Sequence, residues 1–399
     1  MIAAIPSEAR RLIAGRGIRA FVDGFIAILL PVYLVALGCD TFRVGLLSTA
    51  TLLGSALTTL AVGKWGHRVP HRRLLLVAAI TMIATGLAFA GLSDFVPLLA
   101  VAFVGTLNPS SGDVSVFLPL EHARLAHAAT GTARTALFAR YSLTGALFGS
   151  LGALAAALPE FAVRLGVPWL TALRAMFVLY ALAGFVITLL YRKLPTESGS
   201  PRDAMPGLVQ SRRVVARLAA LFSVDAFAGG LLVQSLLALW LFRRFDLSLA
   251  AAASFFFWAG LLTAFSQLAA PRIAARFGLL NTMVFTHIPS SIALMCAAFA
   301  PRAEVALGLL LVRAALSQMD VPTRSAYVMA LVSPKERTAA ASYTAVPRSL
   351  ASALSPSISG ALFAAGWLAT PLFACGVLKI AYDLALLALF RKEPAEERD

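Results

Sequence analysis

Ionisable side chains inside apolar segments are the residues of this chain that can do chemistry. They recur in the same order in both halves, at offsets of 202 to 208 residues: Asp23 and Asp225, Asp113 and Asp320, Arg140 and Arg348. An ionisable group within a membrane segment costs about 2.5 kcal/mol or more, so its presence indicates a function by default. The repeated order indicates a duplicated membrane bundle.

Carboxylates and guanidinium groups at comparable depth can neutralise one another or hold a proton. We expect two clusters, each of two Asp and one Arg, formed by Asp23, Asp113 and Arg140 and by Asp225, Asp320 and Arg348, since an unpaired charge there would be prohibitive. In one interpretation each cluster is a clamp between helices that opens during rocking. In the other, an incompletely compensated carboxylate carries protons.

Composition limits the class of protein that can carry such charges. The chain has 399 residues, of which 59% are hydrophobic and 13% charged, and its mean hydropathy is +0.83. Soluble domains carry roughly 25% charged residues, so this composition predicts a membrane bundle. The net charge of +15 does not indicate nucleic-acid binding, because the basic residues fall in short loops between apolar segments.

Apolar runs of helix length indicate twelve spans, each needing roughly 20 residues to cross a bilayer. They centre near 18–38, 44–63, 73–93, 96–119, 135–157, 169–190, 216–241, 248–269, 280–300, 303–329, 341–365 and 369–390. Lys and Arg gather in alternate loops, which predicts that both termini are cytoplasmic. The first run lacks a cleavage site and is expected to span, in a bacterial inner membrane.

The longest hydrophilic stretch lies at mid-chain and predicts the domain division. It contains Pro195, Pro201 and Pro206 with Ser and Gly residues, as in a flexible tether. We therefore expect a six-helix bundle over 1–192, a cytoplasmic linker over 193–213 and a second six-helix bundle over 214–399. Each bundle starts on the cytoplasmic side with an even number of helices, so the repeats run parallel.

Twelve helices, parallel repeats and a central loop resemble the major facilitator superfamily. Its signature loop between helices two and three is similar to the stretch from Gly63 to Arg73, with His67 at the acidic place and Pro70 at a Gly place. The resemblance implies a conformational loop, and the residues that match it are Gly63, His67, Arg68, Arg72 and Arg73, with Arg276 and Gly278 in the second copy. A solvated loop histidine is an alternative account of His67.

The resemblance implies a substrate cavity lined by helices one and seven, which makes Asp23 or Asp225 the preferred proton carrier. Further candidates for a central site lie on helices one, four, seven, ten and eleven. Candidate lining residues with polar or aromatic groups are Tyr33, Asn108, Ser111, Gln234, Trp240, Arg313, Gln318 and Tyr343. Arg313 would meet an anionic substrate. The spacing of Asp320 with Arg324, and of Lys379 with Asp383, predicts pairs within single helices.

These features predict an all-α secondary active transporter that moves a small organic solute by alternating access. We expect proton-coupled efflux of a hydrophobic compound by antiport, because the presumed cavity is mostly apolar and offers no sodium cage. One alternative is an organic anion or phosphate ester held by intramembrane Arg; another is a non-transporting scaffold or receptor. An enzyme is not expected, because the five histidines lie mostly in loops without nucleophile or metal spacing.

No cofactor, metal or nucleic-acid partner is expected. The partners that the sequence predicts are the lipid bilayer, a small-molecule substrate and protons, and we expect a monomer.

Overall fold

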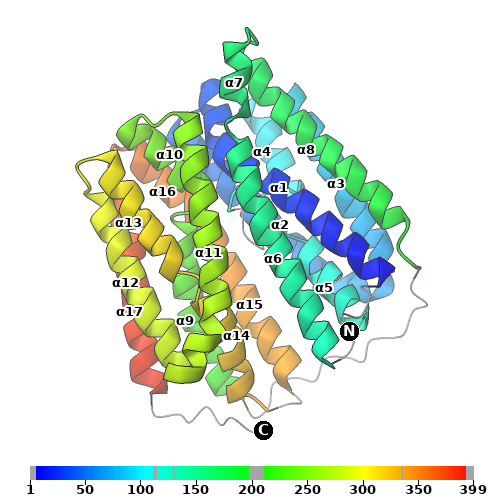
Figure 1. The fold of residues 1–399 in the computed structure, drawn as a ribbon, viewed down its shortest axis with the longest axis vertical. Helices are drawn as coiled ribbons and strands as arrows, with labels where there is room; N and C mark the ends of the chain where they lie inside the picture. Colours follow the sequence, from blue (N-terminus) through cyan, green and yellow to red (C-terminus); the bar gives the residue numbers. More distant parts are fainter. Residues whose placement is uncertain (1–5, 111–114, 129–130, 197–210, 334–335, 392–399) are drawn as a thin grey trace. The chain divides into compact units, whose positions relative to one another are not determined.

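The computed structural model describes residues 6–110, 115–128, 131–196, 211–333 and 336–391. Within these ranges the chain forms α-helices and one short 3-10 helix, and no strand (Figure 1). Two compact units are present: Met1–Arg202 with Gln234–Phe257, and Asp203–Val233 with Trp258–Asp399. The first boundary falls inside the segment 193–213, in which a linker was predicted.

The first unit is built from the helices of the first half of the chain and one helix of the second half. They are α1 (Ser7–Ala36), α2 (Thr41–Trp65), η1 (Gly66–Arg68), α3 (His71–Gly91), α4 (Phe95–Val104), α5 (Phe117–Ala128), α6 (Gly131–Ala155), α7 (Leu158–Arg164), α8 (Trp169–Arg192) and α10 (Gln234–Phe245). The short helix α10 packs on α1 and α2, and the Ser235 amide donates to the Pro109 carbonyl at 3.0 Å.

The second unit contains the remaining helices. They are α9 (Arg212–Gly230), α12 (Leu279–Ala298), α13 (Ala303–Leu316), α14 (Asp320–Leu331), α15 (Arg337–Leu354), α16 (Pro356–Ala364) and α17 (Thr370–Phe390). Helix α11 (Leu249–Phe277) begins in the first unit and continues in the second.

Each predicted span contains at least one helix, and in the described residues ten helical segments are long and apolar enough to cross a membrane. The predicted spans 96–119 and 341–365 are interrupted. The first breaks between α4 and α5, and the second between α15 and α16, where Pro356 takes the first helical position. Proline lacks a backbone donor, so it starts a helix more readily than it continues one.

Small residues allow the closest helix contacts in both units. A Cβ atom on Gly152 of α6 would lie 1.8 Å from the Phe21 carbonyl oxygen of α1, and one on Gly24 would lie 2.2 Å from the Gly149 oxygen. The equivalent pair in the second unit is α9 with α15, where a Cβ on Gly230 would lie 2.2 Å from the Ser352 oxygen. Glycine therefore sets the spacing of the first and fifth predicted spans in the first half.

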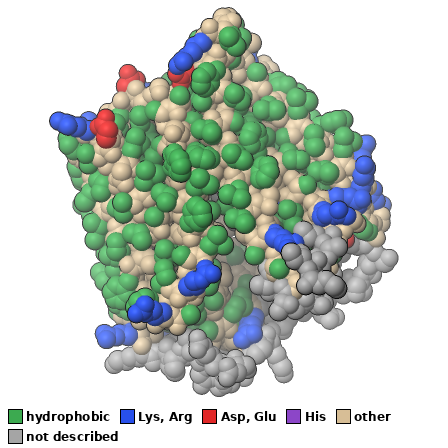
Figure 2. Space-filling view, viewed as in Figure 1, with side chains coloured by type: hydrophobic (Ala, Val, Ile, Leu, Met, Phe, Trp, Pro, Cys, Tyr) green, Lys and Arg blue, Asp and Glu red, His purple; other side chains and the backbone are tan. Residues whose placement is uncertain are grey.

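The surface has the composition of one that contacts lipid. Figure 2 shows hydrophobic side chains over most of the visible face, with Lys and Arg towards its ends. On α3 and α8, large apolar side chains such as Val77, Ile80, Leu182 and Phe185 are exposed. Exposed apolar patches of this kind mark membrane contact.

Candidate functional site

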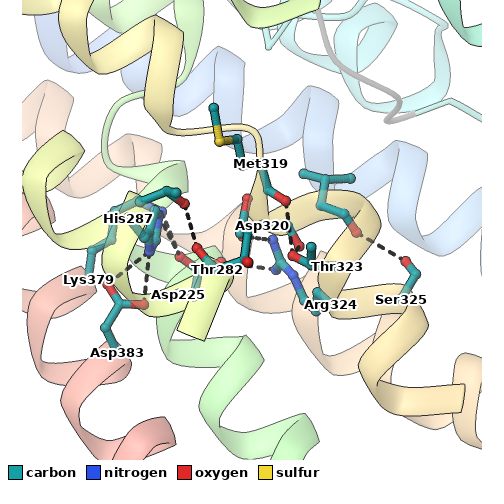
Figure 3. A network of polar contacts seen from close by, with 12 residues as sticks. Asp225, Thr282, His287, Met319, Asp320, Thr323, Arg324, Ser325, Lys379 and Asp383 are labelled. Atoms are coloured by element: carbon teal, nitrogen blue, oxygen red, sulfur yellow. Dashed lines mark hydrogen bonds and ion pairs between the residues drawn. The ribbon is translucent and has the colours of Figure 1, made fainter. Parts of the chain in front are cut away.

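A network of charged side chains lies in the interior of the second unit (Figure 3). Asp225 of α9 accepts hydrogen bonds from Lys379 Nζ of α17 at 2.6 Å and from Arg324 Nη1 of α14 at 3.0 Å. The second nitrogen of Arg324 donates to Asp320 one turn earlier on α14. All four side chains are buried or nearly so, which places two carboxylates and two cations in direct contact within the membrane.

His287 of α12 extends this network to a third carboxylate. Its Nδ1 lies 3.0 Å from Asp383 Oδ2 and 3.1 Å from Oδ1, while its Nε2 lies 3.3 Å from Lys379 Nζ. The imidazole therefore connects Asp383 with the Asp225–Lys379 pair. We call the six residues Asp225, His287, Asp320, Arg324, Lys379 and Asp383 the second-unit charge network.

Asp225 and Asp320 share one cation, as the sequence led us to expect, but this cation is Arg324. Arg348 of α15 is exposed and makes no ion pair within the described part of the chain. The intrahelical pair of Lys379 with Asp383 is replaced by bonds to Asp225 and His287. On α17 the predicted i,i+4 pair therefore gives way to contacts with other helices. On α14 the predicted i,i+4 pair of Asp320 with Arg324 is formed.

The first unit contains a different buried pair. Arg19 of α1 binds Glu121 of α5 through two hydrogen bonds, Nη1–Oε1 at 2.6 Å and Nη2–Oε2 at 2.7 Å. The hydroxyls of Tyr141 on α6 and Tyr191 on α8 also donate to the Glu121 carboxylate, and the Arg19 guanidinium lies 4.4 Å from the centre of the Phe117 ring. Three side chains thus surround the ion pair, and the five residues come from four helices.

Two of the three predicted members of the first-unit cluster, Asp23 and Arg140, lie in the described residues. Asp23 is buried on α1, one turn after Arg19. Asp113 lies outside the described residues, as does Ser111. Arg140 is exposed on α6, and its neighbour Tyr141 points to Glu121 instead.

The ion pairs of the two units join corresponding helices with opposite polarity. In the first half, the cation Arg19 is on the first span and the acid Glu121 is on α5, two residues beyond the predicted fourth span. In the second half, the acid Asp225 is on the first span and the cation Arg324 on the fourth. Each pair therefore joins corresponding helices of its repeat, from different positions along them and with the charges exchanged.

Several predicted cavity residues are used in packing. The Tyr33 hydroxyl donates to the Phe89 and Leu92 carbonyls at 2.5 and 3.1 Å, and its ring lies 4.7 Å from that of Phe177. Asn108 is buried, and its Oδ1 accepts hydrogen bonds from the Ser110 amide and hydroxyl. These contacts stabilise the ends of α3 and the break after α4.

The other predicted cavity residues differ in exposure. Trp240 of α10 is fully buried, and its Nε1 has no hydrogen-bond partner among the described residues. Gln234 and Gln318 are half-buried beside helix breaks, and Arg313 is half-buried on α13. Tyr343 of α15 is exposed.

An apolar groove lies between α1 and α6 of the first unit. It has a volume of about 440 Å³ and is lined by Arg10, Ile13, Ala14, Gly17, Ile18, Thr144 and Phe148. Arg140 precedes Thr144 by one helical turn on the same helix. The groove therefore combines mainly apolar walls with the side chains of Thr144 and Arg10.

The predicted conformational loop is only partly engaged. Arg72 at the start of α3 donates to the Arg192 carbonyl at 2.6 Å and to Thr196 Oγ1 at 2.8 Å. It therefore caps the C-terminal end of α8, where cations are favourable. A Cβ atom added at Gly63 would have no atom within 4 Å. The side chains of Arg68, Arg73 and Arg276 are exposed. Gly278 precedes α12 with a φ of +83°. The backbone of His67 lies in η1.

Arg19, Glu121 and His287 are central residues that the sequence analysis did not select. Glu121 follows the predicted span 96–119, which was ended two residues too early to include it. His287 lies inside the predicted span 280–300, although the sequence analysis places most of the histidines in loops. A polar residue within the span 280–300 was the signal that could have identified it.

Comparison with known proteins gives the family. The family model for the major facilitator superfamily matches residues 12–319. The chain belongs to the major facilitator superfamily. This membership and the fold identify it as an integral membrane protein of a transporter family.

Relatives of this major facilitator chain are distant. It is 24% identical over 398 residues to a Saccharomyces cerevisiae protein described as uncharacterized membrane protein YJR124C, covering 90% of this chain and 89% of the relative. It is similar in structure to the nucleoside transporter NupG, with a TM-score of 0.73 and 14% identity over 96% of this chain and 99% of that one.

Two further solved structures have the same fold. A bacterial homologue of the human lysosomal transporter Spinster gives a TM-score of 0.72 at 16% identity, with 96% of each chain covered. The human organic anion transporter MFSD10 gives 0.64 at 16% identity, over 95% of this chain and 99% of that one. At these identities the similarity shows the fold alone.

Proposed function

We propose that this protein is a secondary active transporter that moves a small amphipathic organic anion by alternating access. The anionic substrate class is argued from the exposure of Arg140 and Arg348 and from their ion-pair partners. Both are exposed, and within the described residues neither has an acidic partner in an ion pair. They differ in this from Arg19 and Arg324, which are bound by carboxylates.

The depth of these arginines supports an aqueous surrounding. Arg140 and Arg348 lie within the predicted spans 135–157 and 341–365, and a guanidinium in hydrocarbon costs about 2.5 kcal/mol or more. An exposed arginine at such a position is stable where water or an anionic ligand reaches it. Charge-assisted hydrogen bonds then favour a carboxylate or phosphate on the substrate.

The apolar part of the proposed substrate is supported by the groove between α1 and α6. Its walls are mainly aliphatic and aromatic, with Phe148 and Ile18 among them. Pockets that bind organic molecules combine such walls with a few polar groups that fix orientation. A solute with one anionic group and an apolar body fits both observations.

A neutral hydrophobic compound is the second candidate, as the apolar composition of the spans suggested. Each Arg that has no acidic partner counts against it, since a neutral ligand leaves the guanidinium uncompensated. We propose proton coupling because buried carboxylates, a lysine and a histidine occur together in the second unit. Export remains the proposed direction, with both termini cytoplasmic.

Purified protein in lipid vesicles tests this proposal. Amphipathic carboxylates and organophosphates are compared with neutral and cationic compounds of similar size, first by thermal stabilisation and then by flux. We expect anions to stabilise the wild type and an imposed pH gradient to drive their uptake or release. Stabilisation by neutral lipophilic compounds alone would overturn the substrate class, and flux that ignores the gradient would overturn the coupling.

A further inference from the structure

His287 is held between an acid and a lysine near the middle of α12. Its side chain is 4% exposed, and that of Asp383 is 1% exposed. In the described part of the chain Asp383 lies within ion-pair distance of no Lys or Arg, whereas Asp225 contacts both Lys379 and Arg324. One carboxylate of the second-unit charge network therefore depends on an imidazole for its compensation.

The neighbours of His287 determine its tautomer in this structure. Lys379 Nζ lies 3.3 Å from Nε2 and 2.6 Å from Asp225 Oδ1. An ammonium group donates hydrogen bonds and accepts none, so Nε2 is the acceptor and carries no proton. The single ring proton is then on Nδ1, which donates to Asp383. The imidazole is neutral in this arrangement, with its lone pair at Nε2 directed to Lys379.

We propose that Nε2 of His287 is the proton-binding atom of the transporter and that Lys379 is displaced when it is occupied. A proton delivered by water forms a new N–H bond at Nε2, and no other covalent bond changes. The positive imidazolium then forms an ion pair with Asp383, and such a pair stabilises a buried carboxylate that has no other cation beside it. Its Nε2–H can no longer accept from the ammonium.

Protonated His287 and Lys379 would compete for Asp225, and this competition would pass the effect of proton binding from α12 to α17 and α9. His287 Nε2 lies 3.9 Å from Asp225 Oδ1, the same oxygen that Lys379 contacts. Two cations about 3.3 Å apart repel each other, so Lys379 loses its place beside the imidazole. Its side chain is 12% exposed, the largest value among the network residues in ion pairs. Protonation on α12 thus weakens the bond between α17 and α9.

Other charged and aromatic groups lie on α13, α14, α15 and α17 of the second unit. Asp320 and Arg324 on α14 pair with each other, and Arg324 also holds Asp225. The Tyr382 ring on α17 lies 6.2 Å from the imidazole. The neighbouring helix α13 carries Arg313, and α15 carries the exposed Arg348, whose charge acts on Asp225 and Arg324. Among these residues only the imidazole has a nitrogen lone pair that can take up a proton, and in this structure it accepts from Lys379.

This inference rests on the proposed proton coupling, but its first test needs no substrate. The full chain, labelled with ¹⁵N-histidine in lipid nanodiscs, is examined by NMR from about pH 5 to pH 8, the range in which histidine changes charge. We expect His287 to pass from the Nδ1–H tautomer to the doubly protonated form as the pH falls. His287→Gln assigns the signal, and His122→Gln on α5 is the matched control that retains it.

Two variants separate proton binding from a structural role. Asp383→Asn removes the charge that the imidazolium compensates, so we expect a smaller protonated fraction of His287 at the same pH. Lys379→Met removes the competing donor, so protonation persists. A His287 that stays neutral over the whole range in the wild type, or a titration unchanged by Asp383→Asn, would overturn the inference.

A flux measurement distinguishes failure of the inference from failure of the proposed function. We expect His287→Gln to exchange substrate across vesicles while losing acceleration by a proton gradient. If the wild type is proton-coupled and the variant is coupled equally, His287 is not the site. If the wild type transports none of the compounds, transport fails as the function, and the NMR titration still reports on His287.

Discussion

Arg19 and Glu121 form a two-pronged ion pair in the first unit, and Asp225 and Arg324 join the corresponding helices of the second unit with the charges exchanged. Each unit therefore has a buried pair between corresponding helices, and either helix can supply the cation. A buried pair costs desolvation of both ions, and its loss on one side leaves an uncompensated charge. This makes the pair a sensitive point of each unit.

Removing one member of the first-unit pair should strongly destabilise the protein. We expect Arg19→Met to lower the free energy of unfolding by about 3–5 kcal/mol, because Glu121 stays buried with tyrosine donors alone. Arg19→Met combined with Glu121→Gln should lose less than the two single losses together. The measurement is a double-mutant cycle by denaturant unfolding in detergent. Arg164→Gln, on an exposed pair with Glu160, is the control and should cost about 1 kcal/mol or less.

The partner of Asp320 can be identified by its energetic coupling. Asp320→Asn with Arg324→Gln should be strongly non-additive, because the two side chains share a hydrogen bond. Asp320→Asn with Arg348→Gln should lie much closer to additivity, since Arg348 is exposed. Coupling of Asp320 to Arg348 that equals its coupling to Arg324 would contradict the observed pairing.

Close contact of α1 with α6 should not tolerate a side chain at Gly152. Its Cβ would lie 1.8 Å from a backbone oxygen of Phe21, so Gly152→Ala forces the helices apart and should cost about 1–3 kcal/mol. Gly63→Ala is the matched control, because no atom lies within 4 Å of the added Cβ. Equal thermal stability of the two variants would show that the helices separate freely.

Tyr33 should contribute to stability rather than to substrate affinity. Tyr33→Phe removes hydrogen bonds to the Phe89 and Leu92 carbonyls, and we expect a loss of about 1 kcal/mol. The dissociation constant of a transported anion, measured on protein that remains folded, should change little. A large change in affinity with unchanged stability would place Tyr33 at the substrate site.

The exposed arginines should act on affinity rather than on stability. A hydrogen bond to a charged group contributes about 1.5–3 kcal/mol, so Arg140→Gln or Arg348→Gln should weaken anion binding roughly ten-fold or more. Unfolding should be nearly unaffected, because each side chain is exposed. Lysine at either position should restore part of the affinity. Anion affinity unchanged in both glutamine variants would show that neither arginine binds the anion.

The amino-acid sequence by itself determined the class of the molecule and the location of several charges. Unbroken apolar runs, scarce charges and basic loops leave membrane-spanning helices as the architecture, because backbone polar groups in lipid must bond within their own segment. Asp225 and Asp320 recur at matched positions, and in the structure both contact Arg324 rather than the predicted Arg348. The similarity of the loop after Gly63 indicated the family that the comparisons showed.

Only the tertiary structure decided which charges meet. Successive residues of a helix point about 100° apart, so a segment can be assigned to the membrane without knowing which face is buried. Arg140 is exposed while Tyr141 reaches Glu121, and on α17 Lys379 bonds Asp225 of another helix rather than Asp383 on its own. The rotation and spacing of packed helices, set by contacts such as that of Gly152 with Phe21, select these partners.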